Sequence, residues 1–401
     1  MKFHRLKFLL QLSQYQKSRT LLSTLKKFFS YHVCVVGSGP SGFYSAKYLI
    51  ENDKNVKVDI IDKLPTPFGL VRFGVAPDHP EVKSVISDFS KVASNDRINF
   101  YGNVHVGKDV TLNTLQQNYS AIILAYGASS DKKLHLPGED SPGVLSARSF
   151  VNWYNGHPDF QYIGDQIDWS SIQTVLVIGQ GNVAIDCARI VAKEATDLMN
   201  TDITSASLHK LKNSNVSTVS LTGRRGHVQM ACTIKEFREL TKLSSVTLHI
   251  DSEELSRGDT VASREEIAAS RPRSRLVSLI NSVAETHTSL SSSSAASDSV
   301  ARTIHMRFLL SPVRVVCSAE GRAIGVEMEH TELEGPAFHQ TARGTGRFTT
   351  IPCDLVLKSV GYMSEPIDNV PFDYTSNTIP HRNGRVIDST GTETERERER
   401  E

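Results

Sequence analysis

Cysteines are few and far apart in this 401-residue sequence, at positions 34, 187, 232, 317 and 353. They include no C-x-x-C pair, which excludes a disulfide framework, a zinc site or an iron–sulfur cluster. No stretch approaches the ~18 apolar residues of a membrane span, so we expect a soluble or peripheral protein. The formal net charge is only +1, which argues against a nucleic-acid partner.

Acidic residues are absent from the first thirty positions, whereas seven lysines and arginines occur there. A basic, acid-free and amphipathic leader is typical of mitochondrial targeting. The longest apolar run, Phe8 to Leu10, is too short for the core of a secretion signal. We therefore predict a mitochondrial transit peptide over residues 1–30, with a disordered basic tail as the alternative.

A glycine-rich turn follows this leader. The sequence HVCVVGSGPSG, residues 32–42, is a β-branched run that breaks at Gly37, Gly39 and Gly42. This G-x-G-x-x-G pattern between a strand and a helix is typical of dinucleotide binding, with the pyrophosphate at the helix N-terminus. A second strand, 56–61, ends in Asp62, near the position ~20 residues past the turn where an acid binds a ribose hydroxyl. The alternative is a glycine-rich turn without a ligand.

The stretch 63–83 contains four prolines and two glycines, which predict a loop that shapes a ligand wall. Helical periodicity follows over 82–92. Two further segments of the same sheet are expected at 99–106 and 121–128, the latter as a buried strand.

A second turn of the same kind lies in TVLVIGQGNVA, residues 174–184, with Gly179, Gly181 and Ala184 at the three small positions. The next strand, 217–222, leads not to an acid but to Arg224 and Arg225. Paired guanidiniums suit a 2′-phosphate, which a carboxylate would repel, and so favour NADP over NAD. The alternative is a solvated loop that happens to carry two arginines. Residues 199–215 are expected to form a surface excursion.

Several longer motifs occur in order, namely GSGPSGFYSA, PFGLVRFGVAPDHPEVK, FYGNV, YGA and LPGE. With these motifs the sequence, from about residue 32 to residue 388, resembles the mitochondrial, adrenodoxin-reductase type of ferredoxin–NADP reductase. The resemblance implies an α/β fold with two Rossmann-like dinucleotide-binding domains of the glutathione-reductase type. The NADP domain would be inserted in the FAD domain.

The same resemblance implies the residues that bind each cofactor. For FAD it adds Ser41, Asp62, Leu70 and Val106 to the first glycine turn. Asp62 stands where relatives usually have Glu, and the shorter acid should reach a ribose hydroxyl directly or through water. For NADP the implied residues are Gln180, Gly181, Asn182, Val183, Arg224, Arg225 and Glu236.

The expected domains follow from these motifs. The FAD-binding domain would begin with 31–135, the NADP-binding domain would occupy 136–349, and the chain would return to the FAD domain over 350–388. Residues 389–401 read as a disordered low-complexity tail. The polar region 252–301 predicts a helix near 276–283 and a flexible, serine-rich excursion after it.

The implied activity is transfer of a hydride from NADPH to FAD, followed by delivery of single electrons to a [2Fe–2S] ferredoxin in the mitochondrial matrix. No catalytic side chain is expected, because the flavin performs the chemistry. The missing C-x-x-C removes the dithiol relay of disulfide-reducing relatives and favours a one-electron protein acceptor. Asp78 and His79 are candidates for the electron exit, or else have no special role.

A predicted helix over 233–243 would place Lys235, Arg238 and Lys242 on one basic face. Such a face is as consistent with plain solvent exposure as with docking. The family resemblance favours docking of an acidic ferredoxin.

After Asp388 the sequence continues as STGTETERERERE, where relatives carry Gly-Trp and Gly-Val-Ile motifs that close over the isoalloxazine. From this we expect weakly held FAD and little activity, so a truncated, impaired nucleotide-binding product is one alternative function. A two-electron flavin subunit resembling the small subunit of glutamate synthase is another, although it predicts cysteine-rich motifs that this sequence lacks.

Overall fold

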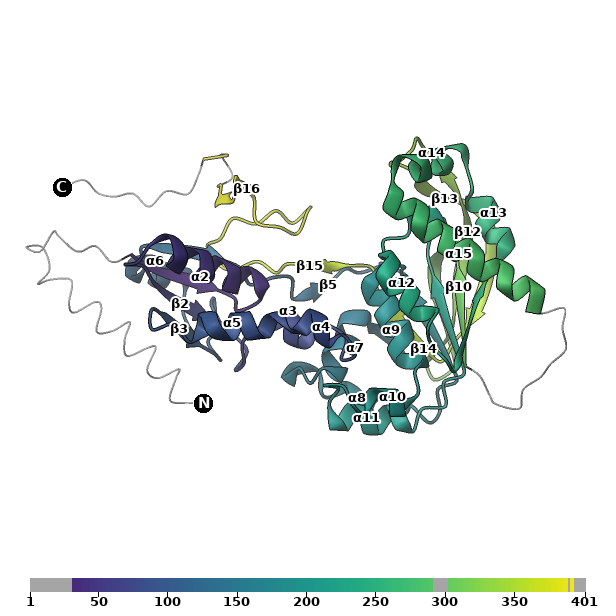
Figure 1. Ribbon diagram of the computed structural model, residues 1–401, viewed down its shortest axis with the longest axis horizontal. Helices are drawn as coiled ribbons and strands as arrows, with labels where there is room; N and C mark the ends of the chain where they lie inside the picture. Colours follow the sequence, from purple (N-terminus) through teal and green to yellow (C-terminus); the bar gives the residue numbers. More distant parts are fainter. Residues whose placement is uncertain (1–30, 291–301, 389, 393–401) are drawn as a thin grey trace, which may run out of the picture. The chain divides into compact units, whose positions relative to one another are not determined.

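The computed structural model describes residues 31–290, 302–388 and 390–392, which form two compact units (Figure 1). Of the described residues, the first unit includes those up to Val75, then His79–Lys132 and those from Tyr362 onward. The second consists of Ala76–Asp78 and Lys133–Gly361. The predicted transit peptide, the excursion after residue 290 and most of the predicted tail lie outside the described residues.

A four-stranded parallel sheet in the order β3-β2-β1-β4 organises the first unit. Because β1 lies between β2 and β4, the chain changes direction beside β1, and such switch points are where parallel sheets bind ligands. The sheet strands are β1 (His32–Val36), β2 (Lys57–Ile61), β3 (Ile98–Tyr101) and β4 (Ala121–Leu124). The helices are α2 (Pro40–Asn52), α3 (Gly69–Phe73), α4 (Pro80–Lys83), α5 (Val85–Ala93) and α6 (Leu112–Asn118). Short pairs are formed by β5 (Ser130–Asp131) with β15 (Tyr362–Met363), and by β16 (His381–Arg382) with β17 (Arg385–Val386).

Both faces of this sheet are covered, as expected for parallel strands. On one face Phe43 of α2 and Phe89 of α5 stack at 5.2 Å between ring centroids, over Val35 and Ile60. Leu115 of α6 belongs to the separate core on the opposite face. The strand β1 is therefore buried from both sides.

The second unit contains a six-stranded parallel sheet in the order β6-β14-β7-β8-β10-β9. Its strands are β6 (Val144–Ser146), β7 (Thr174–Ile178), β8 (Thr218–Thr222), β9 (Val246–Ile250), β10 (Arg302–Arg307) and β14 (Leu355–Lys358). A separate antiparallel sheet joins β11 (Leu310–Cys317), β12 (Ala323–Glu334) and β13 (Thr341–Pro352). As in the first unit, the strand before the glycine turn, β7, lies at a change of direction, between β8 and β14.

Most helices of the second unit contribute to one large apolar core, which includes Ile185 of α9, Phe237 of α12 and Ile280 of α15. They are α7 (Ala147–Tyr154), α8 (Ile163–Gln166), α9 (Asn182–Ala192), α10 (Ala195–Leu198), α11 (Ser205–Lys212), α12 (Ile234–Leu240), α13 (Ser252–Gly258), α14 (Val261–Ala269) and α15 (Arg271–Leu290). Among the described residues, no helix has both the length and the apolar character that a bilayer crossing requires.

Several expectations differ from the structure, among them the strand expected at 99–106, which ends at Tyr101. The stretch 63–83 is not entirely loop, because α3 and α4 form within it, the latter with Pro80 at its start, where proline is favoured. The strand β4 is partly exposed rather than buried, since it is the edge of its sheet. The excursion 199–215 does lie mostly at the surface, as expected, but it includes the helix α11, whose Leu211 is buried. The boundary expected at 349/350 lies instead at 361/362, because β14 pairs with β7 and β6 in the second unit.

Candidate cofactor-binding sites

The glycines of the first turn have different surroundings. Gly37 has φ +106°, and a Cβ there would lie 2.3 Å from the carbonyl oxygen of Ala125. At Gly42 a Cβ would lie 2.1 Å from the carbonyl oxygen of Gly37, whereas at Gly39 it would meet nothing within 4 Å. The first and third glycines are thus required by backbone packing, and the second leaves open space. That is the arrangement a pyrophosphate needs in order to approach the backbone.

The helix after this turn, α2, begins without a capping side chain, and Pro40 is in its first turn. By contrast α6, α7 and α11 begin with a Thr or Ser hydroxyl that accepts a backbone N–H. The uncapped amides of α2 remain available to an anion, which the helix dipole also favours. Ser41 lies in this first turn and is exposed.

Asp62 follows β2 and is hydrogen-bonded to the glycine turn. Its Oδ2 accepts bonds from the backbone N–H of Ser38 at 2.8 Å and from the Ser38 hydroxyl at 2.6 Å. Its Oδ1 accepts the backbone N–H of Leu64 at 2.9 Å. An ionised carboxylate can accept about four hydrogen bonds, so one position remains for a ribose hydroxyl. Asp62 therefore also stiffens the turn, a role that spacing alone did not indicate.

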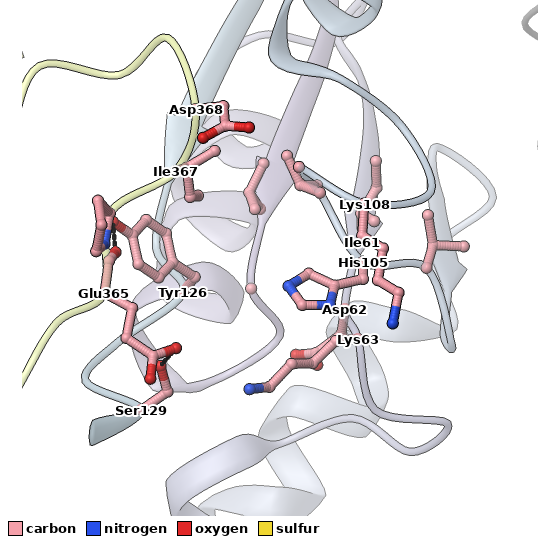
Figure 2. Close-up of a pocket in the computed structure, with 16 residues that line it drawn as sticks. Ile61, Asp62, Lys63, His105, Lys108, Tyr126, Ser129, Glu365, Ile367 and Asp368 are labelled. Atoms are coloured by element: carbon pink, nitrogen blue, oxygen red, sulfur yellow. Dashed lines mark hydrogen bonds between the residues drawn. The ribbon is translucent and has the colours of Figure 1, made fainter. Parts of the chain in front are cut away.

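A cavity of about 290 Å³ lies at this edge of the first sheet, and its lining includes Gly37, Asp62 and Val106 (Figure 2). In Figure 2 the side chains of Asp62 and His105 lie opposite those of Tyr126 and Glu365. The Tyr126 hydroxyl donates a 2.9 Å hydrogen bond to the carbonyl oxygen of Glu365, and the Ser129 hydroxyl donates one of 2.8 Å to the Glu365 carboxylate. Burial and the nearby Glu365 raise the pKa of Tyr126, so its hydroxyl keeps its proton at neutral pH.

Sequence reasoning missed the cavity wall formed by residues 365–368, because no local pattern connects it with residue 126. The YGA motif at 126–128 was the one available signal. Leu70, an expected FAD contact, is 62% exposed on α3 and does not line this cavity. Val106 is buried and does line it.

The second turn repeats the geometry of the first. Gly179 has φ +128°, and a Cβ there would lie 2.2 Å from the carbonyl oxygen of Ser359. At Gly181 a Cβ would meet nothing within 4 Å, and α9 begins directly after it without a capping side chain. The third position holds Ala184, which is completely buried. This turn also presents an open backbone and free helix amides to an anion.

The predicted NADP residues next to this turn are held by backbone contacts. The Gln180 side chain donates a 2.8 Å hydrogen bond to the carbonyl oxygen of Arg307. Asn182 Oδ1 accepts the backbone N–H of Thr233 at 3.0 Å. Val183 packs against the main core of the unit. These contacts position the turn relative to α12.

Arg224 and Arg225 are exposed just after β8. Neither guanidinium is hydrogen-bonded or ion-paired to another residue within the described part of the chain, so both can bind an anion. Glu236, in the first turn of α12, has a buried carboxylate oxygen, Oε2, without a hydrogen-bond partner among the described residues. A buried acceptor of this kind is costly unless a ligand donates to it. The two exposed guanidiniums and the unpaired Glu236 oxygen therefore fit a dinucleotide with a 2′-phosphate.

The proposed docking residues are all exposed, but they do not share one helical face. Lys235 and Arg238 are on α12, which ends at Leu240, and Lys242 lies in the turn that follows. The expected helix was therefore too long at its C-terminal end, where hydrogen bonds of the tighter i to i+3 type close the chain at residues 242 and 243. The three cations remain neighbours in sequence.

Asp78 forms buried ion pairs with Arg189 and Lys193 of the α9 region. Arg189 is only 2% exposed and also pairs with Asp186 at 2.6 Å. Burial alone would raise the pKa of Asp78, but the two cations outweigh it and hold that pKa below its usual value. Asp78 thus has a structural role in the second unit. His79 belongs to the first unit and is 7% exposed.

All five cysteines are free. Burial raises the pKa of Cys232 and that of Cys353 to about 12, and it raises the pKa values of Cys34 and Cys187 as well. Because the thiolate is the reactive form, burial disfavours reaction of these four thiols at neutral pH.

Two parallel sheets, each with a glycine turn at its switch point, define an α/β oxidoreductase class with two dinucleotide-binding units. The family model described as pyridine nucleotide-disulphide oxidoreductase matches residues 31–262. The solved structure of Mycobacterium tuberculosis FprA in complex with NADPH matches with a TM-score of 0.81 and 37% identity, over 89% of this chain and 76% of that one. The expected fold class is confirmed.

Mitochondrial NADPH:adrenodoxin oxidoreductases are similar over nearly the whole chain. The protein from Bos taurus is 45% identical over 362 residues, which are 90% of this chain and 72% of the relative. The protein from Arabidopsis thaliana is 42% identical over 382 residues, 94% of this chain and 77% of the relative. The chain belongs to the NADPH:adrenodoxin oxidoreductases within the pyridine nucleotide-disulphide oxidoreductase family.

Proposed function

We propose that this chain binds FAD in its first unit and NADPH in its second, and passes electrons from NADPH to a [2Fe–2S] ferredoxin. The observation that carries the proposal is the contrast in charge after the two glycine turns. An acid follows β2, where a ribose hydroxyl would bind, and two unpaired arginines follow β8, where a 2′-phosphate would bind. The names of the relatives, which include NADPH and adrenodoxin, support the same assignment.

In the first unit, Gly37, Gly39 and Gly42 would let the FAD pyrophosphate reach the amides of α2, with Ser41 beside it. Asp62 would accept a ribose hydroxyl, and Val106 would provide an apolar wall. When bound, the flavin supplies the exchange between two-electron and one-electron transfer. The chain's task is to hold and orient it.

In the second unit, Gly181 and the uncapped start of α9 would receive the pyrophosphate of NADPH. Arg224 and Arg225 would bind the 2′-phosphate through charge-assisted, bidentate hydrogen bonds. The orphaned oxygen of Glu236 would accept a hydrogen bond from the dinucleotide. Gln180, Asn182 and Val183 would hold the turn in place.

The proposed ferredoxin docks on Lys235, Arg238 and Lys242, which lie on and just after α12. An acidic ferredoxin would be attracted to these exposed cations. The relatives are named as mitochondrial proteins, and we propose the matrix, or the matrix face of the inner membrane, as the location.

The double variant Arg224→Ala/Arg225→Ala tests the assignment. Hydrogen bonds to charged groups contribute about 1.5–3 kcal/mol each, so the KM for NADPH should rise by roughly 100-fold or more, while the KM for NADH changes little. Arg347→Ala, which removes another exposed arginine of the second unit, is the control and should change neither value. Equal losses with both nucleotides would contradict the assignment.

A further inference from the structure

The backbone of Arg224 is held by a buried hydroxyl from a distant strand. Thr331 of β12 is 2% exposed, and its Oγ1 donates a 2.7 Å hydrogen bond to the carbonyl oxygen of Arg224. The backbone N–H of Leu309 donates to the carbonyl oxygen of Arg225 at 3.2 Å, and that of Thr331 donates to Leu309 at 2.9 Å. The side chains of the arginines are exposed, but their main chain is therefore fixed at two successive carbonyl groups.

An ion pair with a buried carboxylate fixes Arg307, which contacts the residue before the arginines. Glu254 of α13, 3% exposed, pairs with the Arg307 guanidinium at 2.6 Å and accepts the backbone N–H of Phe308 at 2.7 Å. The carbonyl oxygen of Arg307 in turn accepts hydrogen bonds from the Gln180 side chain at 2.8 Å and from the Gly223 backbone at 3.1 Å. One carbonyl group thus connects the glycine turn of the second unit with the start of the arginine loop.

The helix α13 also contacts Thr331 itself. Arg257, one turn after Glu254, donates a 3.3 Å hydrogen bond to the carbonyl oxygen of Thr331. Glu254 and Thr331 therefore belong to one connected set of hydrogen bonds that ends on residues 223–225. Neither residue is close in sequence to a glycine motif.

We propose that Thr331 and the Glu254–Arg307 pair are positioning residues that hold the Gly223–Arg225 backbone ready for a 2′-phosphate, and so set the preference for a phosphorylated dinucleotide. This inference rests on the proposed role of the two arginines. Exposed arginine side chains lose rotamer freedom when they bind, and a fixed backbone limits that loss to the side chains themselves. A loop free to move would have to be ordered by the ligand as well, at the expense of affinity.

The test compares Thr331→Val with Thr345→Val in the full chain. Thr345 donates the same kind of hydrogen bond, 2.7 Å to the carbonyl oxygen of His330, but contacts neither arginine. The probes are adenosine 2′,5′-bisphosphate and 5′-AMP, with affinities measured by calorimetry, and the ratio of kcat/KM for NADPH and NADH provides a second readout. Circular dichroism melting shows whether each variant is folded.

For Thr331→Val we expect the affinity for the bisphosphate to fall about tenfold, the size of one lost hydrogen bond, while 5′-AMP binding stays unchanged. Thr331→Ser should restore it, and Thr345→Val should leave both affinities as they are. Glu254→Gln, which keeps the shape of the side chain but not its charge, should likewise lower the affinity for the bisphosphate relative to that for 5′-AMP. It is the second variant if Thr331→Val folds poorly. Equal losses for both probes, no loss, or the same loss in Thr345→Val would overturn the inference.

The Arg224→Ala/Arg225→Ala background separates the two proposals. There Thr331→Val should have no further effect on bisphosphate binding, because the groups that it positions are gone. If the double variant loses its preference for the bisphosphate and Thr331→Val does not, the positioning inference alone fails. If the double variant keeps that preference, the arginine assignment itself fails.

Discussion

The two glycine turns of this chain have similar backbone geometry but different surroundings. Gly39 and Gly181 both face open space, and α2 and α9 both begin without a side-chain cap. The third small position is glycine in the first turn and alanine in the second. At Gly42 a methyl group would lie 2.1 Å from a carbonyl oxygen, whereas the methyl of Ala184 is buried without difficulty.

The residues that follow the second strand of each unit, β2 and β8, differ even more. Asp62 is hydrogen-bonded to the turn that it accompanies, so the first site is braced by its own acid. Arg224 and Arg225 point to solvent and are held only through their main chain. The same anion-binding turn can thus serve two dinucleotides, because selectivity depends on the residues after β2 and β8 rather than on the glycines.

The sharpest test of this contrast is a methyl group added to the third position of the first turn. We expect Gly42→Ala to destabilise the first unit by about 3 kcal/mol, the upper end of the usual range for overpacking, because backbone must move to accept the Cβ. Bound flavin per chain, read from absorbance, should fall in parallel with urea stability.

The reverse change, Ala184→Gly, is the matched control. It removes a methyl from a helix and should cost only about 1 kcal/mol, with flavin content unchanged. If Gly42→Ala kept full flavin content and stability, the first turn would be as permissive as the second.

A smaller effect is expected from Asp62→Asn, which tests whether the acid braces the turn. The buried Ser38 N–H would face an amide that accepts at only one atom, so we expect a loss of about 1–2 kcal/mol in stability. FAD affinity should fall as well. A variant with unchanged urea stability would show that Asp62 contributes to ligand contact alone.

Much of this contrast could be predicted from the sequence. The positive φ of Gly37 and Gly179 is a conformation that few residues other than glycine adopt. The glycine pattern of the local sequence is therefore enough to predict both turns. The strand before Arg224 was expected as the strand that follows the second glycine turn and its helix. These signals depend on neighbours in sequence.

What the sequence did not reveal depends on contacts between distant segments. Glu365 closes the first cavity from 239 residues beyond Tyr126, and Thr331 contacts the carbonyl of Arg224 across 107 residues. A lone threonine or glutamate carries no periodicity that would mark it. Short elements were also missed, because α3 and α4 have too few residues for a helical pattern.

The smallest effect is expected at the surface, where the second unit is proposed to meet its ferredoxin. Charge reversal of Lys235, Arg238 and Lys242 to Glu should raise the KM for an acidic [2Fe–2S] ferredoxin, with each exposed pair contributing less than about 1 kcal/mol. Salt should weaken the unaltered protein's interaction, because such pairs are screened over about 8–10 Å at near-physiological ionic strength. The KM for NADPH is the internal control and should not change, since these side chains are not among its proposed contacts.

Arg343, exposed on β13 and paired with Glu334 at 2.6 Å, offers a matched reversal away from α12 that should leave ferredoxin kinetics as they are. If reversal of all three cations left both the KM for ferredoxin and its salt dependence unchanged in a folded protein, ferredoxin would have to dock elsewhere.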